Sequence, residues 1–457
     1  RLSTMFLIPG VNVRLFFLLF HVISSAPLVA WYRTPKALSY HLYLYANKPY
    51  SRLLWNIFYW FEFGNLFVVT WLELVNMAQT ARGGSFQDAV EIFRMMPCVG
   101  YLLLAMAKSY KIVYHRSVYE NLVNELRSMW PRGQVSDEEH QIVSTALRHL
   151  NYVIQGYYWC NNALLVIFLS PPFVEIIKIA MGQEVPLIFP FFYWFPFDPF
   201  QRGYYEVILA AQTWHGLITI WFMLCGDLLF CIFLSHITTQ FDLLAVRVRG
   251  LVYVPLDKQL VDVNPLDLID TFDDKDWEEK HQKDLSEIIV RHRALVRLSG
   301  DVEDMFSFAL LVNFFNSSII ICFCGFCCVV MEKWNEMVYK SFLTTALSQT
   351  WLLCWYGQRL LESSEGLSDA LYESGWYRAS KKIKSSVLIM LHRAQKDVHV
   401  TTYGFSIISL ASYTTVRTYN CEKKPCRSAN FLSHEILFIF SDHQDILVVF
   451  HLAPEYL

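Results

Sequence analysis

The chain has 457 residues, of which 54% are hydrophobic and only 17% are charged. A soluble domain of this size carries charge on about a quarter of its residues, so the composition indicates a polytopic membrane protein. The net charge of −3 gives no reason to expect a nucleic-acid partner.

The N-terminal part raises a question of topology. Residues 13–30 resemble the apolar core of a signal peptide that ends in small residues. An uncleaved span there would invert every later helix, which the loop charges described below oppose. We expect residues 1–52 to be a segment of doubtful origin, either a gene-model extension or an incomplete start, and cytoplasmic in its later part.

Beyond this segment, apolar stretches of membrane-spanning length recur along the chain, since a spanning helix needs about 20 apolar residues. The pattern predicts an all-α membrane protein with seven transmembrane helices. The expected spans are residues 53–78, 86–107, 150–178, 206–236, 303–331, 339–357 and 398–419.

The loops between these stretches differ in basic charge. Residues 108–148, 237–300 and 358–397 together carry 22 Lys and Arg, whereas the other three loops carry three. Basic loops stay on the cytoplasmic side during insertion. The N-terminus is therefore predicted to be cytoplasmic and the C-terminus extracellular, the reverse of a G-protein-coupled receptor.

We expect four polar residues of the first span to face the bundle or water because they are costly in lipid. They are Asn56, Glu62, Asn65 and Glu73. Near the expected outer surface, Glu91 could pair with Arg94, and Glu175 with Lys178, because each pair is three residues apart on its helix.

Two connections have a distinctive pattern. Residues 108–127 place apolar side chains at helical spacing, which predicts a cytoplasmic amphipathic helix continuing the second span. Residues 270–279 are strongly acidic and are expected to form a solvated loop.

The expected outer loop, residues 186–200, is unusual because eight of its 15 residues are Phe, Tyr or Trp and five are Pro or Asp. It cannot form a regular helix or remain fully in water. Two interpretations stay open: an aromatic belt at the membrane interface, or a lid over an apolar cavity.

Catalytic motifs are missing: we find no Gly-rich phosphate loop, His-Glu-x-x-His pattern or Gly-x-Ser-x-Gly elbow. Cys322, Cys324, Cys327 and Cys328 lie in an apolar run that favours helix packing over metal binding. We therefore expect no enzyme activity, no metal and no cofactor.

Several segments together resemble the insect odorant receptor family, in its lepidopteran type. The resemblance rests on residues 108–116, 194–198, 391–396 and 403–410 and extends over about residues 40–419. It implies a receptor domain at residues 53–419 with seven spans. It also implies a ligand-gated, non-selective cation channel that is a heterotetramer with the odorant-receptor co-receptor. Such a channel lies in the plasma membrane of olfactory neuron dendrites and detects volatile hydrophobic odorants or pheromones.

Three alternative functions compete with this one. A gustatory-type chemoreceptor channel differs mainly in its ligand. A G-protein-coupled receptor would carry Asp-Arg-Tyr after the third span and Asn-Pro-x-x-Tyr in the seventh, and this chain has neither. A transporter would show internal repeats and helices broken in matching halves, and none is visible.

The resemblance places an odorant pocket in the outer half of spans two to six and a pore along the seventh. For each single residue, ordinary helix packing is the competing explanation; this holds for His215, a lone histidine in its span. The pocket candidates are Phe93, Met96, Tyr101, Phe168, Phe173, Gln212, Trp214, His215, Phe315, Phe342, Thr345 and Ser348. The pore candidates are Thr402, Ser406, Ser409, Ser412 and Tyr413.

The chain departs from the family pattern at its end. Residues 420–457 contain Cys421 and Cys426, the one plausible disulfide pair outside the membrane, and then an unrelated apolar stretch. We expect this atypical tail to be a gene-model artefact, such as a read-through intron, that would shorten or rebuild the pore helix.

Overall fold

The computed structural model describes residues 49–413 apart from 130–135, 182, 184, 202, 252–274 and 331–332. Most of the expected N-terminal segment, the tail at 420–457 with Cys421 and Cys426, and Asp270–Asp274 of the acidic stretch lie outside the described residues.

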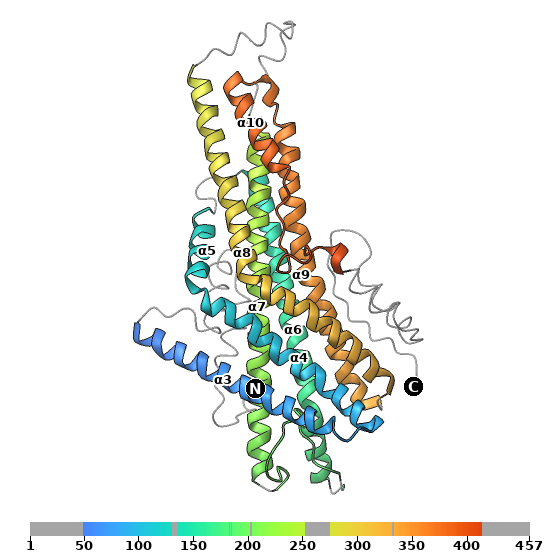
Figure 1. The fold of residues 1–457 in the computed structure, drawn as a ribbon. Helices are drawn as coiled ribbons and strands as arrows, with labels where there is room; N and C mark the ends of the chain where they lie inside the picture. The colour runs from blue at the N-terminus through green and yellow to red at the C-terminus, as the bar shows by residue number, and fades with distance from the viewer. Residues whose placement is uncertain are drawn as a thin grey trace.

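The described part is helical, and its helices form one elongated bundle (Figure 1). Apart from an isolated bridge between Thr401 and Ile407, that part contains no β-structure. Four of its helices, α4, α6, α7 and α8, are long and apolar enough to cross a membrane. The helices are α3 (Pro49–Thr80), α4 (Phe86–Tyr114), α5 (Arg116–Met129), α6 (Asp137–Ala180), α7 (Tyr204–Arg249), α8 (Lys275–Val330), α9 (Lys333–Glu373) and α10 (Lys381–Ala394), with a 3-10 turn at Trp376–Arg378.

Several helices extend well beyond the predicted spans. Helix α7 continues to Arg249, α8 already begins at Lys275, and α9 runs to Glu373. The prediction ended each span where apolar residues end, but a helix needs only suitable backbone conformation and packing partners to continue. These extensions lie side by side with α10 at one end of the bundle (Figure 1). In the expected topology this is the inner end, and the end that carries residues 186–200 is the outer end.

Helix starts follow local capping chemistry. The Ser85 hydroxyl accepts from the Asp88 backbone N–H at 3.1 Å, while the Asp88 carboxylate accepts from the Ser85 N–H at 2.9 Å. Ser136 caps α6 by accepting from the Glu139 N–H at 3.2 Å. These bonds satisfy backbone donors that a helix start leaves free, so α4 and α6 begin at defined residues.

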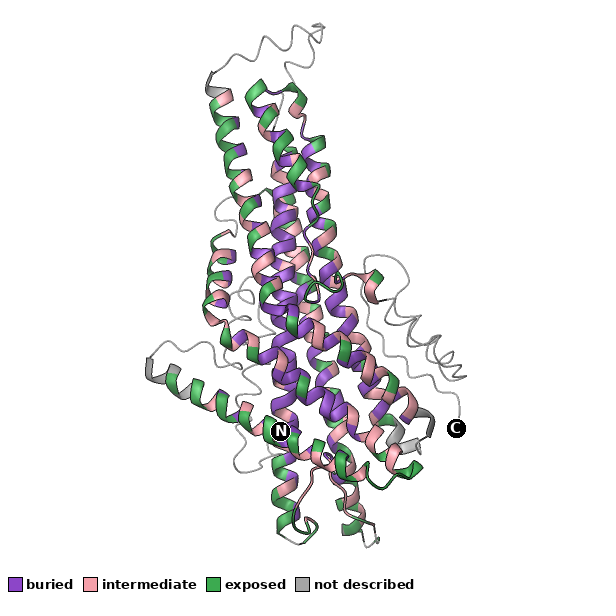
Figure 2. Cartoon of the chain, viewed as in Figure 1, coloured by how far each residue is buried: buried purple, intermediate pink, exposed green. Residues whose placement is uncertain are grey.

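Helix α7 is the centre of the bundle. It packs against α9, α6, α4 and α8, and it is buried along most of its length (Figure 2). A close approach to α4 occurs at Gly226, where an added Cβ would lie 2.8 Å from the Lys108 Cβ. Only glycine allows the two backbones to come this close.

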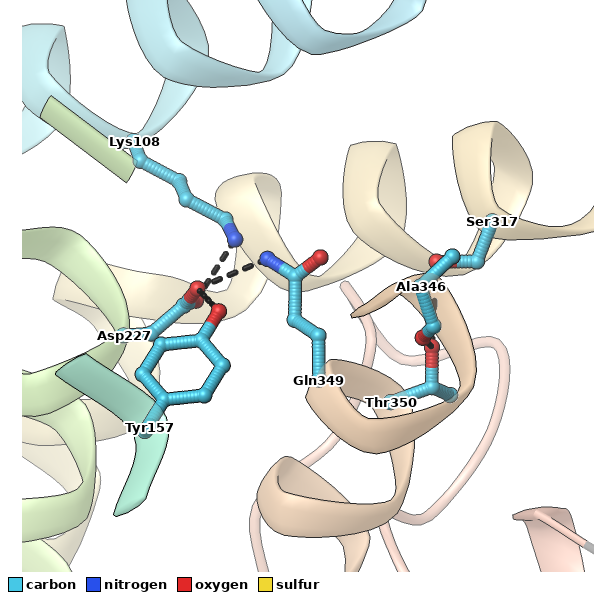
Figure 3. A network of polar contacts seen from close by, with 7 residues as sticks. All are labelled: Lys108, Tyr157, Asp227, Ser317, Ala346, Gln349 and Thr350. Atoms are coloured by element: carbon cyan, nitrogen blue, oxygen red, sulfur yellow. Dashed lines mark hydrogen bonds and ion pairs between the residues drawn. The ribbon is translucent and has the colours of Figure 1, made fainter. Parts of the chain in front are cut away.

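A buried polar network joins α7 to three neighbours near this contact (Figure 3). Asp227 on α7 accepts from the Lys108 ammonium at 2.6 Å, the Tyr157 hydroxyl at 2.6 Å and the Gln349 amide at 2.7 Å. The Lys108 and Asp227 side chains are only 4% and 2% exposed. Lys108 was counted as a cytoplasmic loop residue, which was wrong: Asp227 draws it into the bundle.

The amphipathic helix expected after the second span is present as α5, which buries Tyr119, Leu122 and Leu126. It does not continue α4, however, because the helix breaks at His115, whose backbone is non-helical. The end of the acidic stretch also differs from the expected loop, since α8 begins at Lys275.

The seventh span, expected at residues 398–419, begins with a hairpin instead of a helix. The Ile408 N–H donates to the Val400 carbonyl at 2.9 Å, and Tyr403 and Gly404 form the turn with φ of 53° and 78°. β-Branched residues on one side and a glycine that tolerates positive φ favour this turn over a helix. The helix resumes near Leu410 and is described only to Tyr413.

The Asp227 network makes a testable prediction for stability. Lys108→Met or Asp227→Asn alone leaves a buried charge without its partner, which costs about 3–5 kcal/mol. We expect either change to lower the apparent melting temperature of the purified protein on the order of 5 °C or more. The double variant should recover most of this loss. Arg249→Met, which breaks an exposed pair with Glu373, is the control, and equal losses in all variants would contradict the prediction.

Candidate functional site

The 186–200 loop folds back onto the bundle and is tied to α7 through its backbone. Gln212, which is fully buried, accepts from the Phe191 N–H at 3.1 Å and donates to the Phe191 carbonyl at 3.2 Å. Tyr205 donates its hydroxyl to the Ile188 carbonyl at 3.0 Å. A loop with so many prolines has few backbone partners of its own, so these side-chain bonds determine its position.

Helix α3 holds the same loop from the other side. The Trp194 N–H donates to the Leu72 carbonyl at 3.4 Å, and the Asn76 amide donates to the Phe192 carbonyl at 3.0 Å. The loop is therefore a structured wall between α3 and α7.

The polar residues of the first span were expected to face the bundle or water, and three of the four face the bundle. The Glu62 carboxylate accepts from the Trp214 indole N–H at 3.2 Å, and the Asn65 amide contacts His215 at 3.1 Å. Glu73 is completely buried. Asn56 instead lies exposed near the start of α3.

Of the two expected charge pairs, one is present. Lys178 contacts Glu175 at 3.1 Å. The Arg94 pairing with Glu91 was wrong: Arg94 donates to the Tyr339 hydroxyl at 3.4 Å and lies over the Phe192 ring. A flat guanidinium finds aromatic partners there, whereas Glu91 is exposed.

Four aromatic rings from α4, α6, α9 and the loop form a continuous cluster. Tyr101 lies 5.1 Å from Phe342, Phe342 lies 5.5 Å from Phe168, and Phe168 lies 5.0 Å from Phe191, measured between ring centroids. These spacings are those of favourable edge and tilted aromatic contacts. Three predicted pocket residues thus meet at one place, and the loop supplies the fourth ring.

On the side that faces α7, the aromatic cluster contacts His215 through Tyr193. Tyr193 stacks beside Phe191 at 5.5 Å and shares a hydrogen bond of 3.3 Å with His215. Burial raises the pKa of Tyr193 well above its ordinary value, so the phenol stays neutral. His215 is thus positioned from both sides, because Asn65 occupies its other ring nitrogen.

Polar atoms also border the cluster from α6 and α9. Thr345 is buried and donates to the Ser341 carbonyl at 2.8 Å, while the Cys160 sulfur lies 3.9 Å from its hydroxyl. The buried Tyr101 hydroxyl has no hydrogen-bond partner in the described residues. The arrangement is a packed aromatic cluster with a few polar groups at its edges, a composition typical of sites for small organic molecules.

The remaining pocket candidates lie away from this cluster. Phe168 and Phe173 are five residues apart, which on an α-helix places them on different faces, and Phe173 is 45% exposed. Phe93 packs on Phe323 and Phe326, and Met96 packs in a separate apolar cluster. Trp214 donates to Glu62, and Ser348 donates to the Thr344 carbonyl. Phe315 is exposed.

The pore candidates lie in the hairpin and the short helix after it. Thr402 is buried within the hairpin, where its N–H donates to the Ser406 carbonyl at 2.8 Å. Ser409 accepts from the Ser412 N–H at 3.3 Å, the geometry of a helix N-cap. Tyr413 packs partly buried against the core.

The hairpin is anchored to two helices. The Glu303 carboxylate on α8 accepts from both the backbone N–H and the hydroxyl of Thr401. On α9, Gly357 lies so close to the Ile408 carbonyl that a Cβ would be 2.4 Å away. The pore candidates are therefore coupled mechanically to α8 and α9.

Sequence reasoning missed the Asp227 network and the loop residues Phe191 and Tyr193. A signal for Asp227 was available, because a single carboxylate inside an apolar span must find a partner. No such signal identified Tyr157 or Gln349 as its partners. Within the described residues, no group of three or more His, Cys, Asp or Glu could hold a metal ion.

Comparison with known proteins agrees with this architecture. A model of the family described as 7tm Odorant receptor matches residues 88–419. Odorant receptor 85c of Drosophila melanogaster is 25% identical over 394 residues, covering 83% of this chain and 95% of the relative. Odorant receptor 67c of the same species is 26% identical over 383 residues, covering 82% and 88%.

Solved structures show the same fold. The insect olfactory receptor OR5 from Machilis hrabei has a TM-score of 0.70 at 15% identity, covering 88% of this chain and 97% of that one. Its complex with eugenol has a TM-score of 0.71 at 13% identity, covering 90% and 100%. The expected all-α, seven-helix membrane fold is confirmed, while the lepidopteran type stays a prediction. Since the family model covers most of its length, the chain belongs to the 7tm odorant receptor family, which consists of receptors and not of enzymes.

Proposed function

We propose that this chain is the ligand-binding subunit of an odorant-gated, non-selective cation channel, with its odorant site at the Tyr101, Phe168, Phe191 and Phe342 cluster. The observation that carries the proposal is this enclosed aromatic cluster beneath the 186–200 loop, with His215, Thr345 and Gln212 at its edges. The OR5 structure with eugenol supports a small aromatic molecule as a suitable kind of ligand for this fold.

The chemistry of the cluster favours volatile, largely apolar ligands. A ligand that buries about 300 Å² of apolar surface gains roughly 7 kcal/mol at about 25 cal/mol per Å², before the cost of association. One hydrogen bond to Thr345 or His215 adds roughly 1 kcal/mol. Shape therefore dominates affinity, and the polar atoms discriminate among functional groups.

Of the two interpretations of the 186–200 loop, we favour the lid. An aromatic belt would present its rings to the membrane interface. Phe191 is buried, and its backbone is held by Gln212 on α7. The loop therefore encloses the cluster on its outer side.

Gating requires that the ligand bind the open arrangement more tightly than the closed one, because equal affinity shifts no equilibrium. Helix α9 carries Phe342 in the cluster and Gly357 against the hairpin that contains the pore candidates Thr402 and Ser406. A small displacement of α9 would therefore move both the aromatic cluster and the hairpin. The pore candidates Thr402, Ser406, Ser409, Ser412 and Tyr413 belong to this proposal.

The assembly and location follow the family resemblance. We propose a heterotetramer with the odorant-receptor co-receptor, in the plasma membrane of olfactory neuron dendrites, with a cytoplasmic N-terminus and an extracellular C-terminus. When Lys108 is no longer counted as a loop residue, the loops predicted to be cytoplasmic still carry far more Lys and Arg than the other loops. A gustatory-type channel would share this architecture and differ in its ligand.

The first prediction from this function concerns the odorant site. In cells that express this chain with the co-receptor, volatiles should evoke a cation current that persists when G-protein signalling is blocked. Phe168→Leu should raise the half-maximal concentration of an active volatile about tenfold, a loss of about 1.4 kcal/mol, because it removes the ring between Phe342 and Phe191. The matched control Phe173→Leu, on an exposed position of the same helix, should leave it unchanged. Equal responses of the two variants, at equal surface expression, would move the site elsewhere.

The second prediction concerns the lid. Gln212→Leu removes both bonds to the Phe191 backbone and should increase hydrogen–deuterium exchange in residues 186–195 by about thirtyfold, since two net hydrogen bonds are worth roughly 2 kcal/mol. Thr213→Val is the control, because among the described residues the Thr213 hydroxyl bonds only to the Leu209 carbonyl of its own helix. Unchanged exchange in Gln212→Leu would show that packing alone holds the loop.

The third prediction concerns the pore. Ser412→Arg places a cation in the path proposed for cations and should reduce single-channel conductance by electrostatic repulsion. Ser368→Arg, at a partly exposed position on α9, should leave conductance unchanged. A normal conductance in Ser412→Arg would exclude this residue from the pore lining.

A further inference from the structure

A second buried polar feature lies outside the aromatic cluster. Glu73 on α3 is fully buried, with 0% of its surface exposed. Neither of its carboxyl oxygens has a hydrogen-bond partner in the described residues. An uncompensated buried carboxylate is among the costliest groups a protein can contain, so this side chain calls for a functional explanation.

The surroundings of Glu73 differ from those of the other acidic residues. Glu62 on the same helix bonds to the Trp214 indole, and Asp227 has three donors. Glu73 instead faces the backbone amide of Phe192 without completing a bond. The Cys98 thiol on α4 and the Tyr193 phenol in the loop are close enough to interact electrostatically with Glu73. The carboxyl therefore lies between α4 and the 186–200 loop.

Beside Glu73 lies an apolar cluster that is separate from the main core. Its buried members are Met77, Met95 and Val99, with Ile92, Met96 and Phe192 packed against it. Asn76 connects the two features, because its amide reaches both the Met95 sulfur at 3.8 Å and the Phe192 carbonyl at 3.0 Å. Methionine side chains are flexible and polarisable and adapt readily to different guests.

We infer that Glu73 is the hydrogen-bond donor of a second ligand site, between α3, α4 and the 186–200 loop, for small carbonyl compounds such as ketones, aldehydes and esters. The inference rests on the proposed ligand-binding function and adds a site and a ligand class to it. The methionine cluster accommodates the carbon skeleton, and the carboxyl recognises the oxygen.

The charge state of Glu73 selects this class of ligand. Among the described residues no cation lies beside Glu73, and ionisation of its carboxyl in this apolar environment is far more costly than protonation. A protonated carboxyl has one O–H to donate. A carbonyl oxygen accepts this bond without changing its own charge, whereas an amine would first have to lose the proton that it carries in water.

The inference is tested first without any current. In purified full-length protein at neutral pH, the infrared spectrum should contain a protonated-carboxyl band that disappears in Glu73→Gln and remains in Glu91→Gln, an exposed carboxyl on α4. Cyclohexanone should shift this band, and cyclohexane should not. The shift should persist in Phe168→Leu, which alters the aromatic cluster only.

Three results would overturn the inference. They are an unchanged spectrum in Glu73→Gln, a band that cyclohexanone does not shift, and a band that cyclohexylamine removes by taking the proton, which would indicate an amine site. These results do not depend on channel activity, so failure of the second site is distinguishable from failure of the proposed channel function.

A functional measurement adds a matched pair of variants. Where a carbonyl volatile activates the channel, Glu73→Leu should raise its half-maximal concentration about fivefold, the worth of one neutral hydrogen bond. Glu73→Gln retains an N–H donor of similar size and should stay within about twofold of the wild type. Equal losses in Gln and Leu at equal surface expression would contradict a donor role.

Discussion

The carboxylate of Asp227 is the constraint on which the bundle depends. It is buried in the centre of α7, and its charge is compensated by Lys108, Tyr157 and Gln349 from α4, α6 and α9. A charge in an apolar interior requires all its partners at once, so the four helices have one arrangement that satisfies it. The same helices, or the loop attached to α7, carry the aromatic cluster, and the network therefore also positions the proposed odorant site.

The outer end of the bundle combines an apolar interior with a polar framework. Gln212 and Asn76 hold the backbone of the 186–200 loop from α7 and α3. The Phe191 ring is thereby turned inward, where it meets Phe168. Polar groups that would be costly in lipid thus hold the loop in place, and the apolar side chains between them remain available to a ligand.

Helix α9 contacts the aromatic cluster, the Asp227 network and the hairpin. Along it lie Phe342 of the aromatic cluster, Gln349 of the Asp227 network and Gly357, which touches the hairpin at Ile408. On the opposite side, Glu303 of α8 holds the same hairpin. Because packed interiors transmit displacement instead of absorbing it, a rigid helix with these contacts is a suitable element for linking a ligand to the start of a pore.

The sequence by itself determined the class of fold, the order of the helices and the family. Hydropathy and loop charge depend on local composition, and they placed six of the helices, although their polar extensions were missed. The hairpin before residue 409 was also missed, because Val398 to Ile408 is as apolar as a span. Only the tertiary structure shows which pocket candidates meet, that Lys108 pairs with Asp227, and that Glu73 has no hydrogen-bond partner among the described residues. These are relations between side chains on different helices, which depend on helix rotation and packing and leave no pattern along the chain.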